Sequence, residues 1–193
     1  MRKMIITGVT SGIGKALVEK YNDNYEVEGH SRRFNKHDID DIKNWFDKDA
    51  DIFINNAYND YKWWAQTQAL LYVFHLWKDD PNKHIVSVSS IASEKDTDDY
   101  PIGHSRYTAG KISLDKINLE CYEKTAKHNG CKVSLLRPGW VETPRTTRLA
   151  TLINRLYDQN LEPKMLSPEQ CADAIDFMIN YSGRIREMTI EAT

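Results

Sequence analysis

The stretch Met4-Ile5-Ile6-Thr7-Gly8-Val9-Thr10-Ser11-Gly12-Ile13-Gly14 joins a short apolar run to three closely spaced glycines. The apolar run predicts a buried strand, and the residues that follow the glycines predict a helix. Glycines at such a junction let the backbone approach a ligand, while the free N–H groups and dipole of the helix N-terminus attract negative charge. In a chain with nine glycines, this spacing arises by chance in roughly two chains per hundred. The stretch predicts a phosphate-binding loop.

A second motif, Tyr107-Thr108-Ala109-Gly110-Lys111, places a phenol and an ammonium four residues apart. On a helix these two side chains share one face, and a neighbouring cation makes the phenol a better proton donor. The spacing alone is weak evidence, because Tyr58 and Lys62 also match it. Their context differs, since only Tyr107 follows a strand-like run that ends in two serines. We therefore take Tyr107 and Lys111 as the functional pair, and we interpret Tyr58 and Lys62 as a solvated helix start.

Together these motifs resemble those of the short-chain dehydrogenases/reductases of the compact single-domain type. The resemblance implies a Rossmann fold, a nicotinamide cofactor and the interconversion of an alcohol and a carbonyl in a small molecule. The matching segments follow the family's order along almost the whole chain: Thr7 to Gly14, Asp38-Ile39, Asn55-Asn56-Ala57, Val86 to Ser90, Tyr107 to Lys111, and Pro138 to Thr143.

Strand and helix patterns alternate through the sequence, which predicts an α/β fold: a single-domain doubly wound parallel sheet over residues 1–193. The strands are expected at Met4 to Thr7, Tyr25 to Gly29, Asp51 to Asn55, His84 to Val88, Val133 to Arg137 and Met188 to Ile190. The helices are expected at Ile13 to Tyr21, Asp40 to Phe46, Trp64 to Lys78, Tyr107 to Lys127, Thr146 to Tyr157 and Pro168 to Asn180. Ser167 and Gln170 form a capping signature before the last helix.

The residues after the second predicted strand bear on which cofactor binds. Arg32 and Arg33 favour NADP(H), because guanidinium groups match phosphate geometry, whereas the nearby acid Glu28 keeps NAD(H) possible. From the glycine loop and the resemblance we expect the following cofactor-binding residues: Gly8, Thr10, Ser11, Gly12, Ile13, Gly14, Arg32, Arg33, Asp38, Ile39, Asn56, Ala57, Tyr107, Lys111, Pro138, Gly139, Val141 and Thr143.

By resemblance and by physical argument, Tyr107 donates a proton to the carbonyl oxygen, Ser90 binds that oxygen, and Lys111 binds the nicotinamide ribose and lowers the pKa of the tyrosine. Ser89 is the alternative to Ser90, although we expect it to point the other way along the strand. Asn59 aligns near the family's fourth catalytic residue, which orders a relay water. A loop asparagine is also a common turn residue, so both interpretations of Asn59 stay open.

Three features depart from the family's pattern. An acidic insert, residues 94–99, lengthens the spacing between Ser90 and Tyr107, and a surface loop absorbs such an insert at little free-energy cost. Tyr58 stands where the family has a glycine, so its side chain narrows the site or repositions the loop. The stretch from Asn56 to Ser90 is short, and a helix that the family usually has there is missing.

The substrate pocket is less well defined by the sequence. Trp140, the segment Thr146 to Leu166, Trp63 and Tyr100 are candidates for its wall, and residues 144–166 are expected to form a substrate loop or lid. Arg145 and Arg148 could bind an anionic substrate, but exposed arginines are also common at helix starts. The sequence names no particular substrate.

The composition narrows the classes of partner. A net charge of −2 without a basic stripe argues against nucleic acid, no apolar stretch has the length of a membrane span, and the three cysteines lack metal-ligand spacing. We expect a cytoplasmic protein with reduced thiols and no metal that forms a homodimer or homotetramer through the helices at 64–78 and 107–127. Two alternatives are a nucleotide-binding redox-sensing regulator and a nucleotide-sugar epimerase or dehydratase. The intact Tyr107, Lys111 and Ser90 argue against the first, and the short stretch after Pro138 argues against the second.

Overall fold

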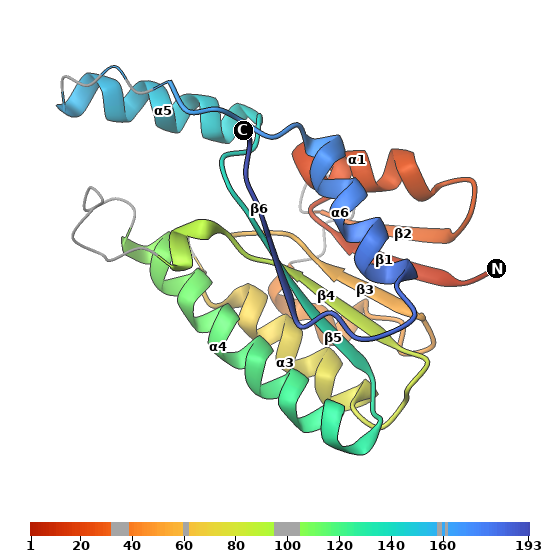
Figure 1. Ribbon diagram of the computed structural model, residues 1–193. Helices are drawn as coiled ribbons and strands as arrows, with labels where there is room; N and C mark the ends of the chain where they lie inside the picture. Colours follow the sequence, from red (N-terminus) through yellow and green to blue (C-terminus); the bar gives the residue numbers. More distant parts are fainter. Residues whose placement is uncertain (32–38, 60–61, 95–104, 158–159, 161) are drawn as a thin grey trace.

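The computed structural model describes residues 1–31, 39–59, 62–94, 105–157, 160 and 162–193. Within them six parallel strands form one sheet in the order β2-β1-β3-β4-β5-β6 (Figure 1). The strands are β1 (Lys3–Thr7), β2 (Glu26–His30), β3 (Ile52–Asn55), β4 (His84–Val88), β5 (Lys132–Pro138) and β6 (Glu187–Ile190). All six lie within one or two residues of their expected positions, and the predicted α/β class with its parallel sheet is confirmed.

Successive side chains of the inner strands point to opposite faces of the sheet, and each face is covered by a pair of helices (Figure 1). On one face, Met4 and Ile6 pack in the core beneath α1 (Gly12–Tyr21) and α6 (Pro168–Asn180). On the other face, Ile5 packs in the core beneath α3 (Ala65–Trp77) and α4 (Ser105–His128). The near-continuous apolar runs of the inner strands β1, β3, β4 and β5 agree with this burial on both faces, whereas the edge strands β2 and β6 are more polar.

The strand order reverses between β1 and β3, because β2 lies on one side of β1 and the remaining strands lie on the other. In such sheets ligands bind in the crevice at the carboxyl ends of the strands on either side of that reversal. The glycine loop follows β1, and Asn56-Ala57 follows β3. The topology therefore places both segments beside the crevice.

Helix boundaries differ from the sequence prediction in several places. The stretch expected as the helix Asp40 to Phe46 is instead a 3₁₀-helix, η1 (Ile39–Asn44), because so short a segment forms few i→i−4 hydrogen bonds. A second 3₁₀ turn, η2 (Ile91–Ser93), follows β4 and was not predicted. At α6 the capping box predicted from Ser167 and Gln170 is confirmed.

Helix α5 (Pro144–Tyr157) begins two residues earlier than predicted and extends away from the body of the molecule (Figure 1). After α5 the chain comes back to the residues that precede this helix, because Val141 and Leu166 form a parallel β-bridge. Two hydrogen bonds of 2.8 Å secure this return, from the Leu166 N–H to the Trp140 carbonyl and from the Glu142 N–H to the Leu166 carbonyl. The two ends of the segment 144–166 are therefore held together.

Within the described residues, no helix is both long and apolar enough to cross a membrane. The three cysteines carry free, buried thiols, and burial raises the pKa of each one: Cys121 to about 11, and Cys131 and Cys171 to about 12.

Candidate active site

The glycine loop has the geometry that its sequence predicted. Gly8 and Gly12 have positive φ angles of 78° and 54°, which side chains other than glycine rarely adopt. At Gly14 a Cβ atom would lie 2.2 Å from the Gly8 carbonyl oxygen, so the first turn of α1 packs directly on the loop. Ser11, the N-cap of α1, is exposed and makes no side-chain capping bond. The loop therefore presents a helix N-terminus at the crevice.

A buried hydroxyl joins this loop to the segment after β3. The Thr7 Oγ1 atom accepts hydrogen bonds from the backbone N–H groups of Asn56 (2.9 Å) and Ala57 (3.0 Å). The same hydroxyl donates to the Ile54 carbonyl at 3.3 Å, and the Asn56 side-chain amide donates to the Thr7 carbonyl at 2.9 Å. These bonds fix the two walls of the crevice relative to each other.

Tyr107 and Lys111 lie in the first two turns of α4. The Lys111 side chain is almost fully buried, and its Nζ atom donates two hydrogen bonds of 2.8 Å, to Gln66 Oε1 and to the Val88 carbonyl. The same nitrogen lies 5.5 Å from the ring centre of Tyr107 and 5.6 Å from that of Tyr58. The predicted Tyr/Lys pair thus shares one face of the helix, beside a second tyrosine.

Burial lowers the pKa of Lys111 from 10.5 to about 7, because the charged form loses its hydration. The Asp115 carboxylate, one helical turn further along α4, acts in the opposite direction. The Arg145 guanidinium lowers the pKa further. The charge on Lys111 therefore depends on a few identifiable neighbours.

Ser89 and Ser90 end β4 with different roles. Ser89 is buried and its hydroxyl donates to the Asp115 carboxylate, which also accepts from Ser93 Oγ and from Arg137 Nε, both at 2.6 Å. Ser90 is partly exposed, and its Oγ atom accepts a bond of 3.2 Å from the Ala92 N–H. Ser89 thus serves the Asp115 network, which agrees with the choice of Ser90 as the substrate-binding hydroxyl.

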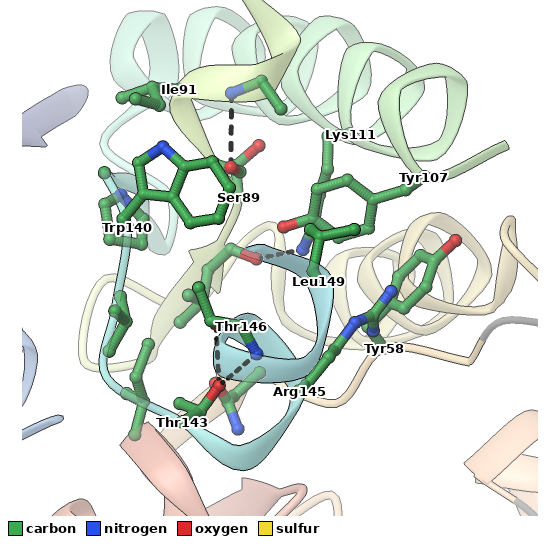
Figure 2. A pocket seen from close by; sticks show the side chains of 18 residues that line it. Tyr58, Ser89, Ile91, Tyr107, Lys111, Trp140, Thr143, Arg145, Thr146 and Leu149 are labelled. Atoms are coloured by element: carbon green, nitrogen blue, oxygen red, sulfur yellow. Dashed lines mark hydrogen bonds between the residues drawn. The ribbon is translucent and has the colours of Figure 1, made fainter. Parts of the chain in front are cut away.

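A cavity of about 200 Å³ lies where these segments meet (Figure 2). Nine of the predicted site residues line it: Ile13, Asn56, Ser90, Tyr107, Lys111, Pro138, Gly139, Val141 and Thr143. The other lining residues are Tyr58, Val88, Ser89, Ile91, Ala92, Trp140, Arg145, Thr146 and Leu149. Thr143 also connects the cavity to the glycine loop, since a Cβ atom on Gly12 would lie 2.9 Å from its methyl group. Residues far apart in the sequence therefore converge on one small cavity.

The structure corrects the interpretation of Tyr58. The residue lies outside any helix, lines the cavity and packs edge-to-face against Tyr107, with 4.9 Å between ring centres. The guanidinium of Arg145 lies 4.6 Å from the Tyr58 ring centre and 5.1 Å from that of Tyr107 (Figure 2). The replacement of the family's glycine by tyrosine was the sequence signal that this position is unusual.

Sequence reasoning missed Gln66 altogether. This buried residue in the first turn of α3 donates from Nε2 to the carbonyls of Asn55 (2.8 Å) and Val88 (3.0 Å), while its Oε1 accepts from Lys111. Its backbone carbonyl accepts from the Asn55 side chain at 2.8 Å. A glutamine in a predicted helix gives no local signal, because its partners lie on other elements.

Other predicted residues lie away from the cavity or outside the described part of the chain. Asn59 accepts a bond of 3.3 Å from the Lys62 N–H, as a turn residue does, and it is not among the cavity's lining residues. The Trp63 carbonyl packs against α4 at Gly110, where a Cβ atom would lie 2.7 Å away. Arg32, Arg33, Asp38 and Tyr100 lie outside the described residues, and the side chain of Ile39 is not described.

Glu28, the acid that kept NAD(H) possible, makes two close contacts. One carboxylate oxygen lies 3.3 Å from Lys3 Nζ, and the other lies 2.7 Å from His30 Nε2. His30 in turn stacks on Trp45, with ring centres 4.0 Å apart. The carboxylate is therefore engaged within the protein.

Solved structures similar to this one cover nearly the whole chain. A 4-hydroxyisoleucine dehydrogenase complexed with NADH and succinate superposes with a TM-score of 0.76 at 19% identity, covering 98% of this chain and 97% of its own. An oxidoreductase of the short-chain dehydrogenase/reductase family from Burkholderia thailandensis gives 0.70 at 17%, covering 98% and 91%. ElxO with NADP bound gives 0.67 at 16%, covering 98% of both chains.

This chain has the short-chain dehydrogenase/reductase fold. The expectation drawn from the sequence motifs is thereby confirmed at the level of the fold. No protein-family model and no curated protein matches the sequence.

Proposed function

We propose that the protein is an NADP(H)-dependent oxidoreductase that interconverts an alcohol and a carbonyl in a small molecule. The observation that carries this proposal is the cavity in which Tyr107, Lys111 and Ser90 meet Ile13 and Thr143 beside the glycine loop. A proton donor, its cationic neighbour and a phosphate-binding loop then belong to one site. Fold alone would not support an activity, whereas this arrangement does.

The residues at the crevice fit a dinucleotide. Gly8 and Gly12 adopt positive φ angles that residues with side chains rarely adopt, and the N-terminus of α1 follows directly from this loop. Its N–H groups suit a diphosphate. The part of the cavity lined by Ile13 and Thr143 suits the nicotinamide end, and Lys111 suits the neighbouring ribose.

Side chains of the protein itself supply the proton and stabilise the group that loses it. A reduced nicotinamide bound in this crevice would be the source of the hydride for the carbonyl carbon. The Tyr107 hydroxyl gives its proton to the carbonyl oxygen, which becomes the alcohol, and the Lys111 ammonium stabilises the phenolate that remains. The Ser90 hydroxyl, whose oxygen accepts a hydrogen bond from the Ala92 N–H, keeps its proton and donates a hydrogen bond to the same carbonyl oxygen.

The preference for NADP(H) over NAD(H) is supported by charge. Arg32 and Arg33 follow β2, where the 2′-phosphate of the adenosine ribose would lie in this fold. The nearby Glu28 carboxylate is engaged by Lys3 and His30. Similar folds bind either cofactor, since ElxO is complexed with NADP and the 4-hydroxyisoleucine dehydrogenase with NADH. The cationic pair is thus the discriminating feature in this chain.

The test is a tryptophan-fluorescence titration with NADPH and with NADH, followed by an absorbance assay over a panel of carbonyl compounds. We expect tighter binding of NADPH, weakened by Arg32→Ala but not by Arg148→Ala, an exposed arginine of α5. Tyr107→Phe should abolish turnover, whereas Tyr122→Phe on the same helix should retain it. Binding without turnover of any carbonyl would favour the redox-sensing regulator, and failure to bind either nucleotide would refute both functions.

We further propose that residues 144–166 act as a substrate lid. Thr146 and Leu149 of α5 line the cavity, and the bridge between Val141 and Leu166 joins the two ends of the segment. A hinge at this bridge would let α5 move over the cavity without disturbing the sheet.

A homodimer or homotetramer is also proposed. Leu71 of α3 and Leu119 of α4 are 45% and 38% exposed, and these two helices pack side by side on one face of the sheet. Light scattering of the wild type and of Leu119→Lys tests this assembly, since a charge there should produce monomers.

A further inference from the structure

We propose that Asp115 is a positioning residue that orients the Ser90 hydroxyl toward the substrate. It acts through Ser89 and Ser93, which lie before and after Ser90 in the chain and whose side chains both bond its carboxylate. This inference rests on the proposed oxidoreductase function, in which Ser90 binds the carbonyl oxygen. It adds to that function a residue outside the sequence motifs.

Ser90 lies where the chain leaves the sheet. It comes two residues after the end of β4 and is the N-cap of the 3₁₀ turn η2. Its Oγ atom accepts a hydrogen bond of 3.2 Å from the Ala92 N–H. Ser89 and Ile91, the two neighbours of Ser90, line the cavity (Figure 2). Because so short a turn has few hydrogen bonds of its own, the direction of the Ser90 hydroxyl depends on what holds the turn.

The Asp115 carboxylate holds this turn at two points. One of its oxygens accepts a hydrogen bond from the buried Ser89 hydroxyl, and the other lies 2.6 Å from Ser93 Oγ. Ser93 Oγ also lies 2.7 Å from the Ser90 carbonyl oxygen, so its one proton is shared between two acceptors. The Ser93 backbone N–H donates to the same carbonyl oxygen at 3.1 Å. Asp115 therefore fixes both the residue before Ser90 and the residue that closes the turn.

Asp115 is itself held in place from strand β5. Arg137 on this strand donates from Nε to the Asp115 carboxylate at 2.6 Å, and from Nη1 to Glu187 on β6 at 3.0 Å. The side chains of Asp115 and Arg137 are only 12% and 13% exposed, so solvent screens their attraction little. Hydrogen bonds to an ionised group are also stronger than those between neutral groups. The carboxylate is thus a firm anchor for the turn that carries Ser90.

Asp115 has a second effect on the site, which the experiment has to separate from the first. Its negative charge favours the charged form of Lys111 and so acts to raise the pKa of that lysine. This effect acts through space and does not involve Ser90. Ser93→Ala isolates the positioning effect, because it removes a hydroxyl from the turn and leaves the charge of Asp115 and its pairing with Arg137 in place.

The experiment is a double-mutant cycle on kcat, with NADPH and the carbonyl compound that the wild type reduces fastest. Ser90→Ala should lower kcat about 100-fold and Ser93→Ala about 10-fold, while the Kd for NADPH stays within about twofold. In the Ser90→Ala background, Ser93→Ala should lower kcat by less than about twofold, because the hydroxyl that it positions is already gone. Ser93→Thr keeps a hydroxyl and should retain most of the wild-type kcat.

Ser113→Ala is the matched control for Ser93→Ala. It removes a half-buried hydroxyl from α4 at a residue that does not line the cavity, so kcat should stay within about twofold of the wild-type value. Asp115→Asn tests the carboxylate itself and should lower kcat about 10-fold more in the wild type than in the Ser90→Ala background. The loss that persists in that background measures the effect on Lys111.

Equal losses in the two backgrounds would overturn the inference, because a merely structural or through-space role of Asp115 does not depend on the Ser90 hydroxyl. Ser93→Ala decides the matter if Asp115→Asn fails to fold, since it keeps the buried ion pair.

Amide hydrogen exchange measures the position of Ser90 without turnover, because the Ala92 N–H bonds Ser90 Oγ. In Ser93→Ala, exchange at Ala92 should become about 10-fold faster relative to the amides of β3, which report opening of the whole fold. Unchanged relative exchange at Ala92 overturns the inference. Failure of the wild type to reduce any carbonyl, with NADPH bound, refutes the proposed oxidoreductase, and the exchange measurement still decides whether the Asp115 network holds the Ser90 hydroxyl.

Discussion

Replacement of Lys111 by methionine should change how the stability of the protein depends on pH. The ammonium is buried, and its pKa is about 7 in the folded chain against 10.5 when exposed. This difference corresponds to about 5 kcal/mol of destabilisation while the lysine remains protonated in both states. Methionine fills a similar volume and carries no proton to lose.

The sign follows from which state holds the proton. Below about pH 7 both the folded and the unfolded chains carry a charged Lys111, so the destabilisation is fully present. As the pH rises through 7, the folded chain releases its proton while the unfolded chain keeps it until about 10.5. The folded state is therefore stabilised relative to the unfolded state as pH rises, by about 2 kcal/mol between pH 6 and 8.5.

Urea denaturation at a series of pH values measures this effect. The free energy of unfolding of the wild type minus that of Lys111→Met should rise by about 2 kcal/mol from pH 6 to 8.5, equivalent to roughly 1 M in the denaturation midpoint. Subtraction cancels the titration of other groups, including the buried cysteines. Lys116→Met, an exposed lysine on the same helix, should give no such slope. Parallel curves for the wild type and Lys111→Met would refute the reasoning.

Three further predictions concern the supports of the site. Gln66→Leu removes the acceptor of a Lys111 hydrogen bond, so it should destabilise the fold by about 3 kcal/mol and lower the pKa of Lys111 further. Gln66→Glu places a negative charge there and should raise that pKa. Urea denaturation at a series of pH values distinguishes the two variants. Gly14→Ala should weaken NADPH binding at least about 10-fold in a fluorescence titration, because its Cβ would overlap the Gly8 carbonyl oxygen. Asp115→Asn should lower the free energy of unfolding in urea by about 3 kcal/mol, because it removes the charge that pairs with a largely buried arginine.

Matched exposed substitutions control these predictions. Gln68→Leu in α3 is the control for Gln66→Leu, Lys15→Ala in α1 for Gly14→Ala, and Glu120→Gln in α4 for Asp115→Asn. Each control changes an exposed side chain on the same helix as its partner variant. Each control should leave the equilibrium constant for unfolding and the Kd for NADPH within about twofold of the wild-type values. A Gly14→Ala variant that binds as tightly as Lys15→Ala would contradict the assigned loop geometry. Likewise, Gln66→Leu or Asp115→Asn would contradict the assigned networks if it were as stable as its control.

The sequence alone determined the fold class, the strands and most of the helices of this protein. Each depends on a local pattern: apolar runs specify the inner strands, and the glycines after Thr7 specify the turn into α1. It also determined that Tyr107 and Lys111 lie on the same side of a helix, because residues four positions apart share one helix face. The 3₁₀-helix at Ile39–Asn44 escaped prediction, since short segments lack the periodicity that separates the two helix types.

Only the tertiary structure decided which distant residues surround that pair. Gln66 bonds Lys111 because α3 packs against α4. Arg145, in the first turn of α5, lies over the ring of Tyr58, which follows β3 in the sequence. These contacts join positions 45 and 87 residues apart, so no local pattern encodes them. The burial that lowers the pKa of Lys111 is likewise a product of packing. The local sequence determines the helices, the strands and the identity of the reactive side chains. The packing of those elements determines the burial and the neighbours of each reactive side chain, and therefore its chemistry.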